Sequence, residues 1–391
     1  MVAILWLNPN ETLASQTKIT WLPVPKYVTN NGQTQITLRA RAHWDIGWLN
    51  SEFGNGNLKG NEIRTARIGF DAKFGSKVSA RGELAFSGNT LNVNEVKVIV
   101  GGPLKFIVGQ QKIGPSISEV TSGNNEPFME RGHFTDAFFV DRGLGLGFFT
   151  NGERWSLTGG ILKGSLQNGF KNEYLTLTTR ATISPKINNG ILHFGGSIRY
   201  RDKTEDEENF SYRQRAHFHY VKTRFIDTGK IGTSDLMFVA EFSYNYNALT
   251  FQTEVAQLTA KLGAPQTRFG NPTFKSSYIG FDWYITGETR PYNPGFGNYG
   301  AIIPKSSVNE GGYGAWQVAA RLDYVDLSDE GILGGEQSSY LFGVNWHLNR
   351  WFRVMLNYTH SIVKEGQFVT HNGAKGQNKV SGFGMRFQFN Y

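Results

Sequence analysis

Apolar and polar residues alternate along most of this 391-residue chain, and this period of two constrains the fold more than any other feature. The segment QITLRARAHWDIGW, residues 35–48, sets Leu38 and Trp44 against Arg39 and Arg41. Successive side chains of a strand point to opposite faces, so the pattern predicts strands with one apolar and one charged face. The same alternation recurs in residues 192–202, 339–349 and 381–391.

The apolar faces are rich in aromatic residues, with 29 Phe, 16 Tyr and 9 Trp in the chain, yet the mean hydropathy is only −0.36. The core of a soluble sandwich would instead carry mostly Val, Ile and Leu. No run approaches the ~20 apolar residues that a membrane-spanning helix needs. Apolar-out and polar-in alternation is the pattern of a barrel with lipid outside and water inside. We therefore predict an all-β fold, a transmembrane antiparallel β-barrel in a bacterial outer membrane.

Short turns and long polar loops alternate along the sequence, as expected of such a barrel. Tight turns are predicted at 74–77, 101–103, 150–153, 184–190, 244–247 and 347–351. Long loops are predicted at 50–61, 113–141, 164–172, 203–233, 261–275, 328–335 and 364–377. About seventeen segments alternate, but single-chain bacterial barrels have an even number of strands. Assigning 203–233 to one inward-folding loop gives a barrel of about sixteen strands.

The barrel is predicted to be one domain, residues 35–391. Residues 1–34 precede it as a periplasmic segment or the remnant of a signal peptide. Residues 288–311 lie on the short-turn side but are long, so this segment is expected to narrow the pore together with 113–141 and 203–233.

The charge of the chain favours anionic partners, because 40 Lys and Arg face 32 Asp and Glu. In YRQRAHFHYVK, residues 212–222, a basic residue or His alternates with another residue type. Arg suits an anion path because its planar guanidinium holds oxyanions and keeps its charge. The arginines expected to attract anions are Arg39, Arg41, Arg199, Arg201, Arg213 and Arg215. For Arg39 and Arg41, salt bridges to Asp45 or Glu83 in a water-filled lumen are an equally good interpretation.

Several sequence features argue against an enzyme or a cofactor site. The chain has no cysteine and hence no thiolate site, and no nucleophile–base motif is evident. His217 and His219 are spaced so that they could hold one metal ion, but without a clear third ligand no metal site is predicted. The GLGLG segment at 143–147 continues a strand rather than opening a helix, so it does not predict a nucleotide loop.

The segments TGETRPYNP, residues 286–294, and GAWQVAARLDY, residues 314–324, are similar to patterns of the phosphate-selective porin O/P family. Further resemblance in GQQKIGPSISEVTSGNNEPFMER, EIRTARIGFDAKFG and the terminal RFQFNY extends the similarity to about residues 35–391. The resemblance implies a sixteen-stranded barrel, usually trimeric, with inward loops and an arginine ladder that leads anions to a constriction. Residues corresponding to that ladder are Arg64, Arg67, Arg213, Arg215, Lys222 and Arg224.

The resemblance also marks residues of the constriction loop. Phosphate-specific members carry a lysine beside a Thr-Ser pair, whereas this chain has Glu119 near Thr121 and Ser122. Repulsion between an inward carboxylate and a unit anion at 4 Å is ~4 kcal/mol at an effective dielectric constant near 20. Glu119 therefore argues against strict phosphate selectivity. Lys112 and Arg131 complete the set of loop residues expected at the constriction.

The predicted function is passive diffusion of small anions, phosphate or polyphosphate among them, through a homotrimer surrounded by outer-membrane lipid and lipopolysaccharide. A general-diffusion porin with weak anion preference or a different solute is the nearest alternative. A soluble binder of nucleic acid or another polyanion is a second, but a soluble protein would not expose one continuous aromatic face. The acidic run 202–209 is expected to be a solvated loop tip, with divalent-mediated contact to lipopolysaccharide as the less favoured interpretation.

Overall fold

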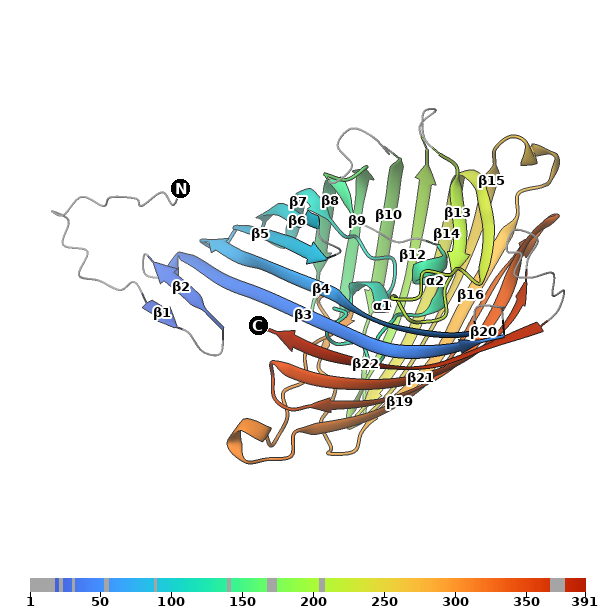
Figure 1. Ribbon diagram of the computed structural model, residues 1–391. Coiled ribbons are helices and arrows are strands. Elements are labelled where there is room, and N and C mark those ends of the chain that lie inside the picture. Colours follow the sequence, from blue (N-terminus) through green and yellow to red (C-terminus); the bar gives the residue numbers. More distant parts are fainter. Residues whose placement is uncertain are drawn as a thin grey trace.

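Sixteen antiparallel strands close into a barrel in the computed structural model, which describes residues 18–20, 24–29, 32–52, 56–87, 90–138, 142–166, 174–203, 208–365 and 377–391 (Figure 1). The barrel closes where the last strand pairs with the first wall strand, from Val380↔Ser51 to Asn390↔Arg41. The wall strands are β3 (Thr34–Ser51), β4 (Gly56–Phe74), β5 (Val78–Ser87), β6 (Thr90–Gly101), β7 (Leu104–Gln111), β8 (Gly143–Asn151), β9 (Trp155–Lys163), β10 (Leu175–Ile183), β12 (Gly190–Asp202), β14 (Ile226–Tyr246), β15 (Leu249–Leu262), β16 (Thr273–Tyr284), β19 (Ala315–Asp329), β20 (Ile332–His347), β21 (Phe352–Glu365) and β22 (Gln377–Asn390).

Shorter elements lie at the ends of the wall and inside it. They are β1 (Lys18–Thr20), β2 (Lys26–Thr29), α1 (Ile117–Val120), α2 (His133–Ala137), β11 (Lys186–Ile187), β13 (Phe210–Gln214), η2 (Gln266–Arg268), β17 (Tyr292–Asn293), β18 (Asn298–Tyr299) and η3 (Val308–Glu310). β2 pairs with the first residues of β3, so part of the predicted N-terminal segment extends the sheet. Among the described residues, no helix is both long enough and apolar enough to cross a membrane.

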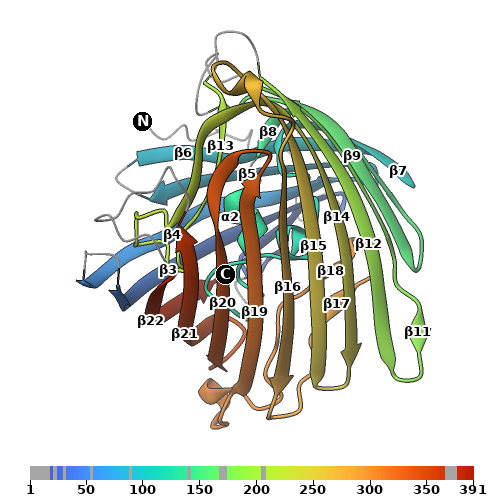
Figure 2. The ribbon, with the colours of Figure 1, turned by 90° about the vertical axis from the view of Figure 1, so that its right-hand side faces the viewer.

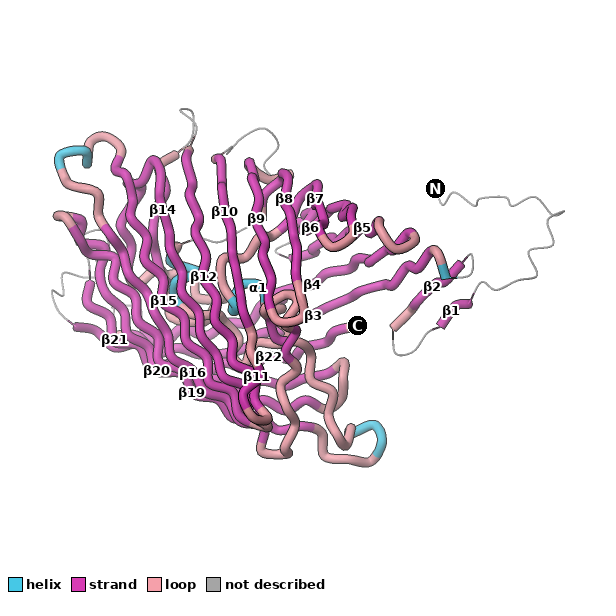
Figure 3. The backbone as a smooth tube through the Cα atoms, turned by 180° about the vertical axis from the view of Figure 1, so that it is seen from behind, coloured by secondary structure: helices cyan, strands magenta, loops and turns pink. Residues whose placement is uncertain are grey.

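Three of the predicted loops are shorter than expected. β14 begins at Ile226, where it pairs with β13. The last eight residues of the loop predicted at 203–233 therefore belong to this wall strand. β19 and β20 run on to a turn at Glu330 and Gly331, which leaves no long loop at 328–335. β4 begins at Gly56, inside the loop predicted at 50–61. Figure 3 shows the strands running along the wall, with the connections gathered at its ends. The predictions for 139–141, 167–173, 204–207 and 366–376 lie outside the described residues.

The outer face carries the apolar side chains that the alternation predicts. Val96, Val98 and Val100 point outward from β6 and are 44–46% exposed. Aromatic side chains also pair across neighbouring strands, as in Trp44 against Phe387, whose ring centroids are 5.5 Å apart. Cross-strand aromatic pairs of this kind stabilise a sheet while they present apolar surface to lipid.

A hydrophobic core lies inside the barrel, between the wall and two inward segments. α2 contributes Phe134, the residue after it is Phe138, and the segment after β12 contributes Tyr212, Phe218 and Phe225; all five are 0–1% exposed. They pack against inner-face residues of β14, β15, β16 and β19. Figure 2 shows α2 enclosed by the ring of strands. The interior is therefore partly filled, and the open space is displaced toward the opposite wall.

Candidate functional site

A cavity of about 900 Å³ remains between the inward segments and the wall formed by β3–β10 and β22. Thirteen Lys and Arg side chains but only five Glu line it among the described residues. The cations are Arg39, Arg41, Arg64, Arg67, Lys73, Arg81, Lys97, Lys105, Lys112, Arg131, Arg142, Arg180 and Arg386. The carboxylates are Glu83, Glu95, Glu119, Glu126 and Glu130.

The positive charge of the cavity comes from the wall strands. Ten of its cations belong to these strands, which contribute only Glu83 and Glu95 as carboxylates. The segment between β7 and β8 contributes three cations and three carboxylates, so its formal charges cancel. An anion in this cavity would therefore meet a cationic sheet on one side and a nearly neutral loop surface on the other.

Strand register places these cations beside one another across the sheet. Arg41 lies opposite Arg67 on β3 and β4, and Arg81 lies opposite Lys97 on β5 and β6. Directly opposite like charges destabilise a sheet. Glu83 offsets part of this repulsion, because its carboxylate lies 3.5 Å from the Arg41 guanidinium and 3.2 Å from that of Arg67.

A β-bulge explains how Arg64 and Arg67, three residues apart, can both face the lumen. In a regular strand they would point to opposite faces. His43 pairs with Thr65 and Trp44 with Ile63, so Arg64 is the extra residue of the bulge. Bulges reorient side chains in this way. Arg64 Nε then donates to Glu130 Oε1 of the inward segment at 3.1 Å.

Ion pairs bind several of the predicted wall arginines to carboxylates. Arg39 lies 3.6 Å from Asp71 and 3.9 Å from Glu83, which also pairs with Arg41. Asp45, the other partner considered from sequence, instead holds Arg386 through two hydrogen bonds of 2.7 Å. Arg39 and Arg41 therefore form the salt bridges to Glu83 that the sequence suggested, and they also line a cavity with a large cationic excess.

The predicted constriction residues lie together in the segment between β7 and β8. The Ser116 hydroxyl caps α1 by accepting a hydrogen bond from the Glu119 N–H. The Glu119 carboxylate contacts the Lys112 ammonium group. Arg131 donates to the carbonyl oxygens of Ser118 at 2.7 Å and Thr121 at 2.8 Å, which fixes the fold of the segment. The Ser122 hydroxyl accepts from the Asn124 N–H at 3.4 Å.

Residues 288–311 meet this same segment inside the barrel. The backbone N–H of Tyr299 donates to Thr121 Oγ1 at 3.2 Å, and Asn298 Nδ2 donates to the Val120 carbonyl at 3.1 Å. Arg180 of the wall donates to the Gly297 carbonyl at 2.8 Å. The hairpin of β17 and β18 thus bridges the loop and the wall at the edge of the cavity.

Glu130 is the carboxylate that ties the inward segment to the cationic wall. Burial of its carboxyl would raise the pKa, but the nearby guanidinium groups of Arg64 and Arg386 outweigh this and hold the pKa well below its usual range. Arg386 Nη2 lies 3.4 Å from Glu130 Oε1. Glu130 is therefore ionised at neutral pH, and it cancels part of the wall charge.

The other predicted cations lie away from this cavity. Arg199 and Arg201 are 4% and 3% exposed and share Asp235 as a partner. They line a small adjoining pocket with Arg142.

Residues 212–222, where basic residues alternate in the sequence, form an extended strand only at their start. β13 ends at Gln214, and His217 adopts a left-handed backbone with φ +55°. Arg215 and Arg224 both pair with Asp136, at 3.2 and 2.6 Å, and so connect this segment to α2. The side chain of Lys222 is 77% exposed and lies 4.0 Å from Glu62, and Arg213 is exposed.

Sequence reasoning missed cations on β5–β7 that line the cavity. Arg81, Lys97 and Lys105 stand at alternate positions to outward Val and Leu residues, which is the signal that identified Arg39 and Arg41. Arg180 and Arg386 follow the same rule on β10 and β22. Following the alternation on every strand, rather than arginine-rich segments alone, would have found them.

Comparison with known proteins gives a family and a fold. The sequence profile described as phosphate-selective porin O and P matches residues 36–391. An uncharacterized protein of Caulobacter vibrioides is 30% identical over 399 aligned residues, which cover 97% of this chain and 79% of that protein. Among solved structures, OmpT of Vibrio cholerae superposes with a TM-score of 0.58 at 11% identity, over 93% of this chain and 99% of OmpT. An anion-selective porin from Comamonas acidovorans gives 0.55 at 11% identity, over 92% of this chain and all of that one.

Proposed function

This chain belongs to the phosphate-selective porin O and P family, and on that premise we propose that it lets small anions, phosphate or polyphosphate among them, diffuse passively across the bacterial outer membrane. One observation carries the proposal: the wall of the cavity presents ten cations and two carboxylates. A family and a fold of this kind are those of a channel rather than an enzyme.

The geometry supports conduction by several weak contacts rather than by one tight site. An anion moving along β3–β6 would meet two cross-strand pairs of cations, Lys97 with Arg81 and Arg67 with Arg41, which stand four residues apart along β4 and β5. Each guanidinium can donate two N–H hydrogen bonds to an oxyanion, which then moves on to the next guanidinium. Selectivity without trapping needs binding that is favourable but divided among sites.

The constriction loop bears on the question of phosphate. A lone carboxylate at Glu119 would repel a dianion, but the Lys112 ammonium group lies against it and offsets its charge. Glu119 is 5% exposed, so it offers little surface to a passing ion. The pair removes the main electrostatic objection to phosphate, and phosphate is therefore kept among the proposed solutes.

The roles proposed for the predicted cations differ with their positions. Arg39, Arg41, Arg64 and Arg67 belong to the anion path, because they line the cavity. Arg215 and Arg224 hold the inward segments together through Asp136. This division is testable, because only substitution of the first group should alter ion selectivity directly.

Replacing Arg41 and Arg67 by Gln together should reduce the anion preference, because two facing cations leave the wall. Single-channel recording across a planar bilayer under a chloride gradient measures this as a reversal potential shifted toward zero. Arg268→Gln, at an exposed position of η2, is the matched control and should leave the potential unchanged. An unaltered reversal potential in the double variant would remove the wall arginines from the proposal.

Phosphate added to the same recordings separates the two candidate solute classes. Block of chloride current by phosphate supports a phosphate-binding path, whereas anion preference without block supports a general anion channel. A cation preference would contradict both.

The assembly is proposed to be a homotrimer. OmpT of Vibrio cholerae, which shares the fold, has been solved in a trimer form. The exposed aromatic and aliphatic side chains of the wall offer apolar surface to lipid or to neighbouring subunits. A detergent-corrected mass three times that of one 43.7 kDa chain supports the trimer, and a single-chain mass contradicts it.

A further inference from the structure

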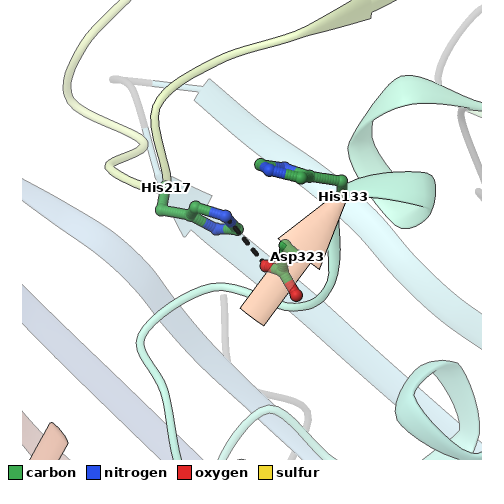
Figure 4. A group of neighbouring side chains, drawn as sticks. All are labelled: His133, His217 and Asp323. Carbon is green, nitrogen blue, oxygen red and sulfur yellow. Dashed lines mark ion pairs between the residues drawn. The ribbon is translucent and has the colours of Figure 1, made fainter. Parts of the chain in front are cut away.

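Two histidines and an aspartate from three distant parts of the chain meet outside the anion cavity (Figure 4). His133 belongs to α2, His217 to the segment after β13, and Asp323 to the wall strand β19. They are 1%, 3% and 0% exposed, and one ligand atom from each lies within 4.8 Å of the others. His217 Nε2 is 2.9 Å from Asp323 Oδ2.

Each of the two imidazoles has a ring nitrogen that makes no hydrogen bond to a described residue. Their rings stack with centroids 4.3 Å apart and an interplanar angle of 26°. His133 Nε2 lies 3.0 Å from the Ser339 hydroxyl, whereas His133 Nδ1 and His217 Nδ1 are buried and make no hydrogen bond to any described residue. Buried polar atoms without partners are uncommon and call for an explanation.

From this arrangement we propose that His133, His217 and Asp323 bind one divalent transition-metal ion of the Zn²⁺ type. Two imidazole nitrogens and a carboxylate oxygen are ligands that Zn²⁺ accepts, and three protein ligands leave a fourth position for water. Ligand atoms of a tetrahedral zinc with bonds of about 2.0–2.1 Å lie about 3.3 Å apart. The ligand atoms would therefore have to approach one another by about 1.5 Å or less, and the two stacked rings would have to turn so that their nitrogens point to one ion.

The surroundings support the ligand roles of both residue types. In the tautomer whose Nε2–H donates to the Ser339 hydroxyl, Nδ1 of His133 is available as a ligand atom, and a hydrogen bond of this kind fixes the ring of a metal-bound histidine. The Arg321 guanidinium lies 2.9 Å from Asp323 Oδ1 and also donates to Oδ2 at 2.9 Å, which orients the carboxylate but competes with a metal ion for both oxygens. The affinity is accordingly expected to be modest.

A bound ion would fasten both inward segments to the wall. Asp136 of α2 already forms ion pairs with Arg215 and Arg224 of the segment after β13. The ion would add a second connection between these two segments and would join both to β19. This role is independent of ion selectivity, because His133, His217 and Asp323 do not line the described anion cavity.

The test uses the full chain in detergent, stripped of metal with a chelator and titrated with Co²⁺, followed by displacement with Zn²⁺. A visible absorption band of tetrahedral Co²⁺ is expected, saturating at one ion per chain and lost when Zn²⁺ is added. His217→Asn and Asp323→Asn should each weaken binding by at least about tenfold. Asn is chosen at 217 because it tolerates the left-handed backbone there.

His219→Gln is the matched control, since His219 belongs to the same segment but pairs with Glu62 at 2.8 Å. Its Co²⁺ affinity should equal that of the unaltered chain. Migration of unheated samples on an SDS gel checks that each variant is folded. Absence of saturable binding by the folded chain, or binding unchanged in folded His217→Asn, overturns the proposal. Either result leaves the reversal-potential test of anion conduction unaffected.

Discussion

At the scale of single residues, one carboxylate organises much of the cationic wall. Glu83 lies within 3.9 Å of Arg39, Arg41 and Arg67, so one negative charge bridges three positive ones. Asn94 at the neighbouring bulge also donates to it. The cluster keeps a positive excess while the carboxylate holds the three side chains in place. A cationic pore needs such anions for its own stability.

Glu126 makes the pore charge depend on pH. Burial raises the pKa of its carboxyl, and Arg290 and Arg131 offset this only in part. The neutral form therefore persists to a higher pH than that of an ordinary Glu, and the side chain gains a negative charge as the pH rises through the raised pKa. The neutral carboxyl of Glu126 is favoured more in the folded chain than in the unfolded chain. The contribution of Glu126 to stability is therefore also lost as the pH rises through the raised pKa.

Anion preference should therefore decrease as the pH is raised, and Glu126→Gln should remove this dependence. Reversal potentials measured from acidic to neutral pH provide the test. Glu208→Gln, which alters an exposed carboxylate beside Lys230, should retain the pH dependence of the unaltered chain. A pH profile unchanged by Glu126→Gln would assign the titration to another group.

At the scale of elements, glycines on the lumen face of the wall receive the inward segment. A Cβ added at Gly384 of β22 would lie 2.5 Å from the Phe218 ring, and one at Gly60 of β4 would lie 2.7 Å from the Tyr220 ring. These distances are shorter than any ordinary carbon contact. The segment after β13 can therefore dock only because these two strands carry no side chain there.

Gly384→Ala should destabilise the barrel by about 1–3 kcal/mol, the usual cost of overpacking. Adding Phe218→Leu should recover part of this loss, since the smaller side chain makes room for the new methyl group. Urea unfolding in detergent measures both. Gly196→Ala is the control, because its added Cβ would meet no atom closer than 3.6 Å. Equal destabilisation with and without Phe218→Leu would contradict this contact.

The elements also show what the sequence could and could not predict. Alternation predicted the outward faces of β3, β20 and β22, because lipid and water impose opposite demands on the two sides of one strand. It failed at the ends of β19 and β20, where the apolar residues Leu327 and Ile332 face inward and are buried in the core inside the barrel. The polar residues at 328–335 indicated a loop, yet β19 and β20 continue there to a turn with Glu330 at φ +48°.

The candidate site was predictable in the same uneven way. Arg39 and Arg41 were found because their strand alternates cleanly, and the resemblance to a family pointed to Arg64. The pairing of Arg64 with Glu130 depends on how a loop 66 residues away folds back, which no local pattern encodes. The meeting of His133 with His217 has the same origin.

At the scale of the whole molecule, closure of the barrel joins residues 341 positions apart. Asp45 of β3 and Arg386 of β22 face each other across the closing seam and are 1% and 3% exposed. Two hydrogen bonds of 2.7 Å connect them. Breaking a buried pair leaves an uncompensated charge, which is costly.

Asp45→Ala should lower the free energy of unfolding by about 3–5 kcal/mol, because it leaves Arg386 buried beside an incomplete set of partners. This loss is measured as a lower temperature at which the folded band disappears on an SDS gel. Glu336→Ala is the control, since it removes an exposed cross-strand pair with Lys364 and should leave that temperature nearly unchanged. Equal effects of the two substitutions would argue against a special role for the seam.

The two sides of the cavity come from different kinds of structure, a hydrogen-bonded sheet and a folded-back loop. The sheet holds most of the charge, whereas the loop residues between β7 and β8 set how far the opposite boundary stands from it. Insertions and deletions are tolerated in loops far better than in closed sheets. Descendants of this chain can therefore change the size of molecule they admit through one stretch of sequence and keep the sign of charge they favour in another.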